Sequence, residues 1–289
     1  MPELPEVETL RRDLQKTLPG RTITRAEVRL PKLFIGHNGL SIDDLAGRRV
    51  QELRRRAKYL IVDLDADHTM VIHLRLAGQV VHRDSTGNTL AEGGHPVPAY
   101  GAPLPHKSTH VLFHLDDGGT VYLTDIRQFG RVWLMPSDDL DPFLEAANLG
   151  PEPLSDALTL PFLRDRLARR GRMPLKPLLL DQSFVGGVGN IYADEIIFAA
   201  KLGPDTRAAE IGARAARRLH DAIKSVLTLA VTEGVAEILN GKAAEWRDFP
   251  RVHGRAGQPC PRCGVTIVKF KFGGRGTYTC PKCQPAARA

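Results

Sequence analysis

The chain has 289 residues, of which 42% are hydrophobic and 25% charged, a composition typical of a folded globular protein with two or three domains. No apolar run approaches the roughly 18 residues that a membrane span requires, and the N-terminal segment lacks the basic and apolar stretches of a secretion signal, so we expect a cytoplasmic protein. The formal net charge of +7, with eight Lys or Arg and no Asp or Glu in residues 251–289, favours a polyanionic partner such as nucleic acid.

The sequence pattern of the first half of the chain predicts one helix followed by many strands. Leucine and valine recur at helical spacing through residues 3–18. After this helix we expect strands such as Tyr59–Leu64 and Thr120–Thr124, without the strand–helix alternation that a parallel sheet needs. We therefore expect a β-sandwich over residues 1–135, with a long surface loop over residues 84–105, which are rich in Gly, Pro and Ala.

The second half of the chain has a different organisation. Prolines mark residues 136–152, which we predict to be an interdomain linker. Residues 153–240 are predicted to form a helical domain, in which Ala208–Thr232 has the clearest helical spacing. Residues 241–289 are predicted to form a small C-terminal module. The expected fold class is therefore α+β and multidomain.

The cysteines of the chain all lie in this C-terminal module. Two Cys-x-x-Cys pairs, Cys260 with Cys263 and Cys280 with Cys283, are separated by sixteen residues of strand character with glycines for a turn. Such pairs each offer two thiolates to a tetrahedral zinc ion, which predicts a zinc ribbon. The zinc would be structural, because four thiolates leave no open position for water. Two disulfides or a redox pair are the alternatives.

The segment Met1-Pro2-Glu3-Leu4-Pro5-Glu6 has two interpretations. In the structural one, Pro5 and Glu6 begin a capped helix, which leaves Pro2 unexplained. In the chemical one, removal of the initiator methionine gives Pro2 a free secondary amine, which can attack a sugar carbon and form an iminium. Glu3 could then supply or accept the proton.

Several motifs together resemble the formamidopyrimidine-DNA glycosylase family over nearly the whole chain. They are Pro2-Glu3-Leu4-Pro5-Glu6-Val7-Glu8-Thr9, Arg55-Arg56-Ala57-Lys58-Tyr59-Leu60, His73-Leu74-Arg75-Leu76-Ala77-Gly78, Asp125-Ile126-Arg127-Gln128-Phe129-Gly130, Lys176-Pro177-Leu178-Leu179-Leu180-Asp181-Gln182, Gly187-Val188-Gly189-Asn190-Ile191-Tyr192 and Gly274-Arg275-Gly276-Thr277.

This resemblance implies a monomeric DNA glycosylase and AP lyase of base excision repair, which removes oxidised purines from double-stranded DNA and cleaves abasic sites. It also implies an N-terminal β-sandwich with a helix, a helix–two-turn–helix domain and a C-terminal zinc ribbon with one structural Zn²⁺.

The resemblance further implies roles for individual residues in catalysis. Pro2 is the expected nucleophile at the sugar C1′, Glu3 the proton donor that helps to open the sugar, and Glu6 an orienting group. Lys58 corresponds to the lysine of the β-elimination step, although phosphate binding is compatible with its position. Arg275 corresponds to the arginine of the δ-elimination step; a solvated loop arginine is the alternative.

Three side chains are expected to fill the gap that an extruded base leaves in the duplex, namely Leu76, Arg127 and Phe129. Without the resemblance, Leu76 and Phe129 would be assigned to the core, and the family usually has Met at the position of Leu76. The expected contacts to the DNA backbone and around the flipped nucleotide are Asn190, Lys176, Arg170, Arg172 and one of His106 and His110. Residues 234–255 correspond to the region of a lesion-covering loop but look short, so no contact is assigned there.

Two other functions remain open at this point. A relative of endonuclease VIII, specific for oxidised pyrimidines, would share Pro2, Glu3, Lys58 and the zinc ribbon, but it usually has Gly in place of Leu4. A non-catalytic zinc-ribbon DNA binder would have no need for Pro2, Glu3 and Lys58 together.

Overall fold

The computed structural model describes residues 2–232 and 249–285. The chain divides into two compact units, an N-terminal unit of residues 2–147 and a C-terminal unit of residues 148–232 and 249–285. No helix among these residues is long and apolar enough to cross a membrane.

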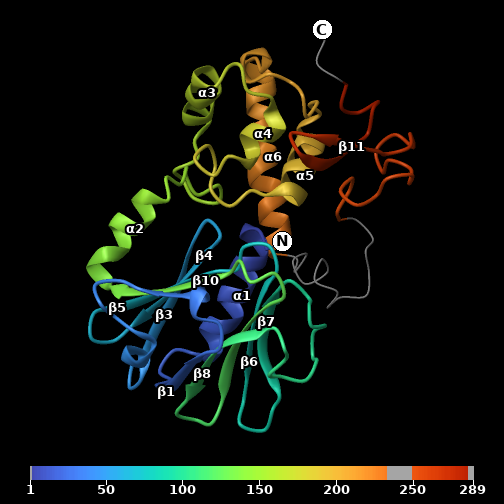
Figure 1. The fold of residues 1–289 in the computed structure, drawn as a ribbon. Helices are drawn as coiled ribbons and strands as arrows, with labels where there is room; N and C mark the ends of the chain where they lie inside the picture. Colours follow the sequence, from blue (N-terminus) through green and yellow to red (C-terminus); the bar gives the residue numbers. More distant parts are fainter. Residues whose placement is uncertain (1, 233–248, 286–289) are drawn as a thin grey trace. The chain divides into compact units, whose positions relative to one another are not determined.

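The N-terminal unit is a β-sandwich of two five-stranded sheets (Figure 1). In one sheet the order is β1 (Ile23–Val28), β8 (Thr109–Leu115), β9 (Thr120–Asp125), β6 (Gly78–Arg83) and β7 (Thr89–Gly94); in the other it is β2 (Phe34–Gly36), β10 (Arg131–Pro136), β5 (His68–His73), β4 (Tyr59–Leu64) and β3 (Val50–Arg56). Neighbouring strands are antiparallel except for β2 and β10. Aliphatic side chains from both sheets meet in one core. The predicted sandwich is confirmed.

Helix α1 (Leu4–Thr17) packs against β7 of one sheet and β3 of the other, both of which are edge strands. Its side chains also hydrogen-bond the edge of β3: Gln15 accepts from the backbone N–H of Leu53 at 2.7 Å, and Arg11 donates to the Leu53 carbonyl at 3.2 Å. On β7 the helix comes so close that a Cβ on Gly93 would lie 3.0 Å from Leu10 Cβ. A side chain at residue 93 would therefore require Leu10 to move by a few tenths of an ångström.

The surface loop predicted over residues 84–105 is wrong in part, because β7 lies within it and pairs with β6 along its length. Of the Ala and Gly residues in this range, Ala91, Gly93 and Gly94 are buried in β7, whereas Gly87, Ala99 and Gly101 are exposed. The boundary between the two units falls after Ala147, inside the predicted linker, which itself contains the 3₁₀ turn η3 (Ser137–Asp139) and helix α2 (Leu140–Ala146).

The C-terminal unit contains α3 (Leu160–Arg169), α4 (Leu175–Leu180), α5 (Asn190–Ala200) and α6 (Ala213–Thr232), followed by the strands β11 (Val268–Phe272) and β12 (Arg275–Thr279). Helix α5 is buried along most of its length, because α4, α6 and β12 pack around it. The predicted helix Ala208–Thr232 is interrupted near its start, where η4 (Ala208–Glu210) precedes α6. Two further 3₁₀ turns, η1 (Pro31–Leu33) and η2 (Ile42–Leu45), lie in the N-terminal unit.

Strands β11 and β12 form a hairpin with a two-residue turn at Gly273 and Gly274. Both glycines have positive φ, 55° and 76°, as the turns that best fit the twist of a hairpin require. Phe272 pairs directly with Arg275 across this turn. Gly276 belongs to β12, and Arg275 is the first residue after the turn.

Candidate active site and metal centre

Pro2 and Glu3 are buried at the start of α1. Glu3 is the N-cap residue, and a capping box links it with Glu6, whose carboxylate accepts the backbone N–H of Glu3 at 2.7 Å. This bond fixes the peptide group that joins Pro2 to Glu3. Glu6 is itself buried, and its role in orienting the site stays a prediction. Met1 lies outside the described residues.

Lys58 lies in the tight turn between β3 and β4, next to Ala57, which has a φ of +50°. Its side chain is largely buried. Arg55 joins this turn to α1: its Nε donates to the Glu8 carboxylate at 3.1 Å and its Nη1 to the Ala57 carbonyl at 2.9 Å. The turn that carries Lys58 is thus tied to the helix that begins with Glu3.

Glu8 is surrounded by arginines. Burial by itself would raise the pKa of Glu8, but hydrogen bonds from Arg11 and Arg12, with the charges of Arg11 and Arg55, lower that pKa from 4.5 to about 2. The carboxylate is therefore ionised throughout the physiological range, and the ion pair with Arg55 persists there.

We expect Glu8→Gln to destabilise the protein at pH 7 by at most about 3 kcal/mol, since one pKa unit corresponds to about 1.4 kcal/mol. Because the pKa of Glu8 is depressed in the folded state, its contribution is complete above the unfolded value near 4.5 and is lost as the pH falls towards about 2. Urea unfolding at pH 7, 5, 4 and 3 should show the difference between wild type and variant shrinking with acidity. Asp13→Asn, which removes an exposed pair with Lys16 on the same helix, should have little effect; a pH-independent loss in Glu8→Gln would contradict this account.

His73, at the end of β5, received no role from the sequence. Burial, followed by the charges of Arg75 and Lys58, lowers the pKa of His73 to about 3, so the ring is neutral. Its Nδ1 accepts the backbone N–H of Arg75 at 2.9 Å, which leaves the proton on Nε2. The neutral His73 ring, with its Nε2–H donor, therefore lies close enough to Lys58 for that charge to lower the pKa of His73. The motif that contains His73 was the only signal for it.

The residues expected to fill the duplex lie in two turns of the N-terminal unit. Leu76 is half-buried in the turn between β5 and β6. Arg127 and Phe129 lie in the loop between β9 and β10, with Phe129 46% exposed and the Arg127 guanidinium 5.1 Å from the centre of its ring. The alternative that Phe129 is a core residue is therefore wrong.

The two histidine candidates make different contacts. His110 is buried, and its Nε2 lies 3.0 Å from the Asp125 carbonyl. His106 is half-buried, and its Nδ1 accepts the backbone N–H of Ser108 at 3.2 Å. A phosphate contact by either one stays a prediction.

In the C-terminal unit, Lys176 and Asn190 both bind the β12 backbone. Lys176 is 1% exposed, and its ammonium donates to Asp194 at 2.7 Å, Thr277 at 2.8 Å and the Gly276 carbonyl at 3.0 Å. The Asn190 amide donates to the same carbonyl at 3.1 Å. These bonds hold the hairpin next to Arg275, which is exposed. A contact from Lys176 or Asn190 to DNA stays a prediction.

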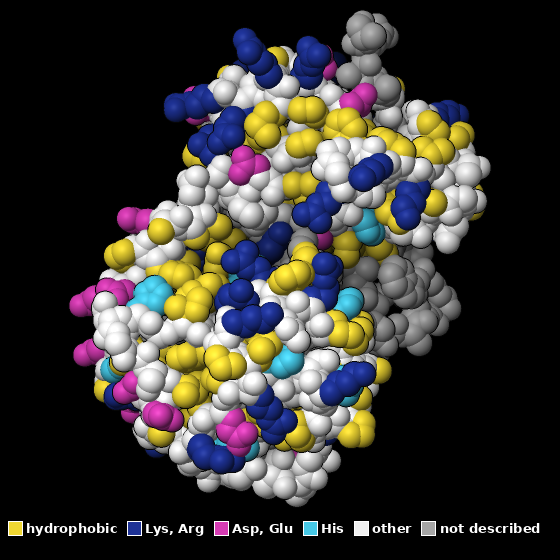
Figure 2. Space-filling model, viewed as in Figure 1, with side chains coloured by type: hydrophobic (Ala, Val, Ile, Leu, Met, Phe, Trp, Pro, Cys, Tyr) yellow, Lys and Arg dark blue, Asp and Glu magenta, His cyan; other side chains and the backbone are white. Residues whose placement is uncertain are grey.

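Arg170 and Arg172 lie just after α3. Arg170 is half-buried and pairs with Asp181 at 3.2 Å, whereas Arg172 is exposed. Lys and Arg side chains are spread over the faces of both units in Figure 2. Cationic surface is therefore not confined to the C-terminal module, to which the sequence drew attention.

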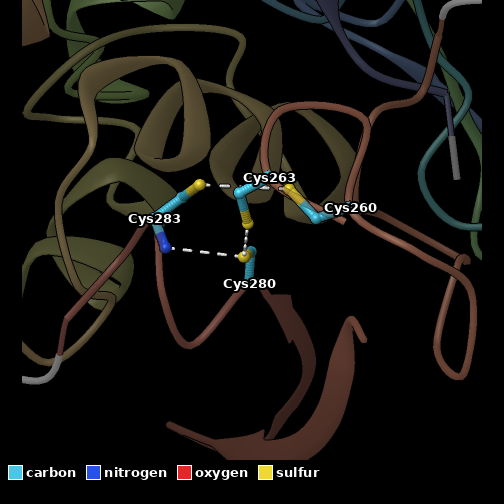
Figure 3. Close-up of side chains that lie close together, drawn as sticks. All are labelled: Cys260, Cys263, Cys280 and Cys283. Atoms are coloured by element: carbon cyan, nitrogen blue, oxygen red, sulfur yellow. Dashed lines mark hydrogen bonds between the residues drawn. The ribbon is translucent and has the colours of Figure 1, made fainter. Parts of the chain in front are cut away.

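The four cysteines, one pair before the β11–β12 hairpin in the chain and one pair after it, come together in space (Figure 3). Their sulfur atoms all lie within 4.8 Å of one another, with Cys260 4.0 Å from Cys283 and Cys263 3.4 Å from Cys280. Four thiolates around zinc at about 2.3 Å are roughly 3.8 Å apart, so the donor set fits one tetrahedral ion. The cysteines are not joined in disulfides, which disfavours that alternative. The zinc is structural, because all four positions are thiolates.

The zinc module packs on α5. Phe198 shares an apolar cluster with Cys260 and Cys280, and Arg262 stacks over the Phe198 ring at 4.1 Å. Glu195, also on α5, accepts the backbone N–H groups of residues 251–253 at 2.8–2.9 Å. Burial raises the pKa of Glu195, and these three amides oppose that rise.

Comparison with known proteins matches each part of the chain to one family. Residues 1–132 match the formamidopyrimidine-DNA glycosylase N-terminal domain, residues 149–240 the H2TH domain of the same enzyme, and residues 257–286 the zinc finger found in FPG and IleRS.

Full-length relatives agree with these matches. The formamidopyrimidine-DNA glycosylase of Pelotomaculum thermopropionicum is 40% identical, and the match covers 98% of this chain and 99% of that protein. The formamidopyrimidine-DNA glycosylase of Heliobacterium modesticaldum is 42% identical, and the match covers 98% of this chain and 100% of that protein. The solved complex of Lactococcus lactis Fpg with abasic-site DNA is 32% identical, with a TM-score of 0.85 over 98% of this chain and 99% of that one. A MutM complex with carbocyclic 8-oxo-G DNA is 33% identical, with a TM-score of 0.86 over 98% and 100%.

The sandwich, the helix–two-turn–helix region and the zinc hairpin thus define a DNA glycosylase of the zinc-finger class. The chain belongs to the formamidopyrimidine-DNA glycosylase family.

Proposed function

We propose that the protein removes oxidised purines, such as 8-oxoguanine and formamidopyrimidines, from double-stranded DNA and then cleaves the strand at the resulting abasic site. The observation that carries this proposal is the buried start of α1, where Pro2 precedes the Glu3–Glu6 capping box, in a member of this family. We further propose that it acts as a monomer on chromosomal DNA in the cytoplasm.

The chemistry begins at the Pro2 nitrogen, once Met1 has been removed. The neutral amine attacks C1′, and the bond from C1′ to the damaged base breaks; the base leaves with the electron pair, and the proton that the Pro2 nitrogen loses neutralises it. Glu3 protonates the sugar ring oxygen, so that the C1′–O4′ bond opens and an iminium joins Pro2 to C1′. Glu6 keeps the Pro2–Glu3 peptide in place through its bond to the Glu3 amide.

Two eliminations follow from the iminium. Loss of a proton from C2′ expels the 3′ phosphate, and a second proton loss further along the sugar expels the 5′ phosphate. We assign Lys58 to the first step and Arg275 to the second, where each cation can stabilise the departing phosphate. Lys58 is held in a turn that Arg55 ties to α1, which supports its assignment to the same centre as Pro2.

The base must leave the duplex before this chemistry, and unstacking costs a few kcal/mol. We propose that Phe129 wedges between base steps, that Arg127 hydrogen-bonds the unpaired partner base and that Leu76 fills the remaining gap. The exposure of Phe129 and the guanidinium over its ring support this assignment.

A panel of duplexes tests the proposed substrate class. Strand cleavage should be fast on duplexes with 8-oxoguanine, formamidopyrimidine or a pre-formed abasic site, and absent on undamaged duplex. Preference for oxidised pyrimidines would favour the endonuclease VIII-like alternative, and binding without any cleavage would favour the non-catalytic one.

Phe129→Ala should reduce cleavage of a paired lesion by about 10- to 100-fold, because part of the cost of extrusion is no longer offset. Cleavage of a pre-formed abasic site in single-stranded DNA should change little. Phe162→Ala is the matched control, since Phe162 is also exposed and also has an arginine, Arg166, over its ring. Equal losses on both substrates would indicate a catalytic or folding defect instead.

A further inference from the structure

The loop between β9 and β10 is built around one buried carboxylate. Asp125, the last residue of β9, is fully buried. Its carboxylate accepts three backbone N–H groups of the following loop: Arg127 at 2.9 Å, Phe129 at 2.9 Å and Gly130 at 2.6 Å. The loop thus wraps around the side chain of the residue that precedes it.

These bonds fix a conformation that the loop would not adopt readily by itself. Gln128, between the two exposed side chains, has a φ of +59°, a left-handed conformation that costs roughly 1 kcal/mol for a residue with a side chain. Gly130 passes so close that a Cβ there would lie 3.1 Å from the Asp125 carboxylate. Three hydrogen bonds to a single side chain, each contributing about 1 kcal/mol, can hold this shape.

The backbone of Asp125 is fixed as well. Its N–H donates to the Ser108 carbonyl at 2.9 Å, and its carbonyl accepts the N–H of Gln128 at 3.2 Å. The His110 ring lies 3.0 Å from the same carbonyl through Nε2; because a carbonyl only accepts, Nε2 carries the proton. The buried His110 therefore supports the base of the loop from β8.

We propose that Asp125 is a positioning residue for base extrusion: its buried carboxylate presets the backbone from which Arg127 and Phe129 project. The inference rests on the proposed function, in which these two side chains enter the duplex. A preset loop lets them enter without first being ordered, and that ordering cost would otherwise be added to the cost of unstacking. Asp125 itself touches no reacting atom.

Asp125→Asn tests this with nearly the same side-chain volume. Asparagine has one acceptor oxygen, and its NH₂ group would face backbone N–H donors. Cleavage of a paired 8-oxoguanine should fall by about 10- to 100-fold, while cleavage of an abasic site in single-stranded DNA stays within about threefold of wild type. Asp138→Asn, at an exposed carboxylate of the same unit, is the control and should behave as wild type.

Two further measurements separate positioning from a general structural role. In a double-mutant cycle, Asp125→Asn should add little to the defect of Phe129→Ala, because both act through the same wedge. Fluorescence of 2-aminopurine opposite the lesion should rise on binding of wild type and not on binding of Asp125→Asn.

Each result bears on a distinct claim. Wild-type activity of Asp125→Asn on the paired lesion, equal losses on both substrates, or full additivity with Phe129→Ala would overturn the positioning role. Failure of the wild-type protein to cleave any damaged duplex would instead overturn the proposed function.

Discussion

Replacing Cys263 by serine is expected to remove the zinc ion and to weaken DNA binding by on the order of 100-fold, since a module of this size derives most of its folding free energy from its metal. Cys260 and Cys280 belong to a small buried cluster with Phe198, Val252 and Ile267. Without the metal we expect this cluster to loosen, and with it the hairpin that presents Arg275.

Metal content and DNA affinity can be measured on the same sample, by mass spectrometry of bound zinc and by fluorescence anisotropy with a duplex that carries an abasic-site analogue. Thr266→Ser, an exposed conservative change between the two cysteine pairs, should retain one zinc per chain and wild-type affinity. Metal-free Cys263→Ser with undiminished affinity would show that the hairpin does not contribute to binding.

Retention of any residue in front of Pro2 is expected to abolish both base release and strand cleavage, by more than about 1,000-fold, because an acylated proline nitrogen is an amide without nucleophilic character. DNA binding should change only a few-fold, since phosphate contacts dominate the affinity. Pro2→Gly should keep a weaker primary amine and part of the activity.

A protein carrying a cleavable N-terminal tag gives the matched control for this prediction. The tagged protein should bind damaged DNA and leave it intact, and proteolysis that exposes Pro2 as the first residue should restore cleavage in the same preparation. Cleavage by the intact tagged protein would show that the N-terminal amine is not the nucleophile.

The elements that the sequence predicted correctly are those with a regular hydrophobic pattern. Strand β4 has the predicted bounds, Tyr59–Leu64, and α1 differs from the predicted helix 3–18 by one residue at each end. Strand β7 was missed because its glycines carry no strand signal. Gly93 packs against α1, which lies some eighty residues earlier in the chain, and Gly94 lies close to the backbone of Gly78 on β6.

The functional site also has parts that a local sequence pattern predicted and parts that it did not. The cysteine spacing alone predicted the metal centre. The start of the chain left a capped helix and a nucleophilic Pro2 with Glu3 both open, and the resemblance to a family decided between them and supplied the role of Lys58. The hydrogen bond from Arg55 to Glu8 joins residues 47 positions apart, and the bonds within the Asp125 loop depend on its folded shape. No local pattern encodes such contacts, because they arise only once the sheets and α1 have assembled.

Reduction of a covalent intermediate tests the central claim, that the Pro2 amine attacks the sugar, most directly. Borohydride added during reaction with an abasic-site duplex should trap the protein on DNA, and digestion followed by mass spectrometry should locate the sugar on the peptide that begins with Pro2. A Lys58→Ala variant should still give this adduct. An adduct on the peptide that contains Lys58, with the Pro2 peptide unmodified, would contradict the account.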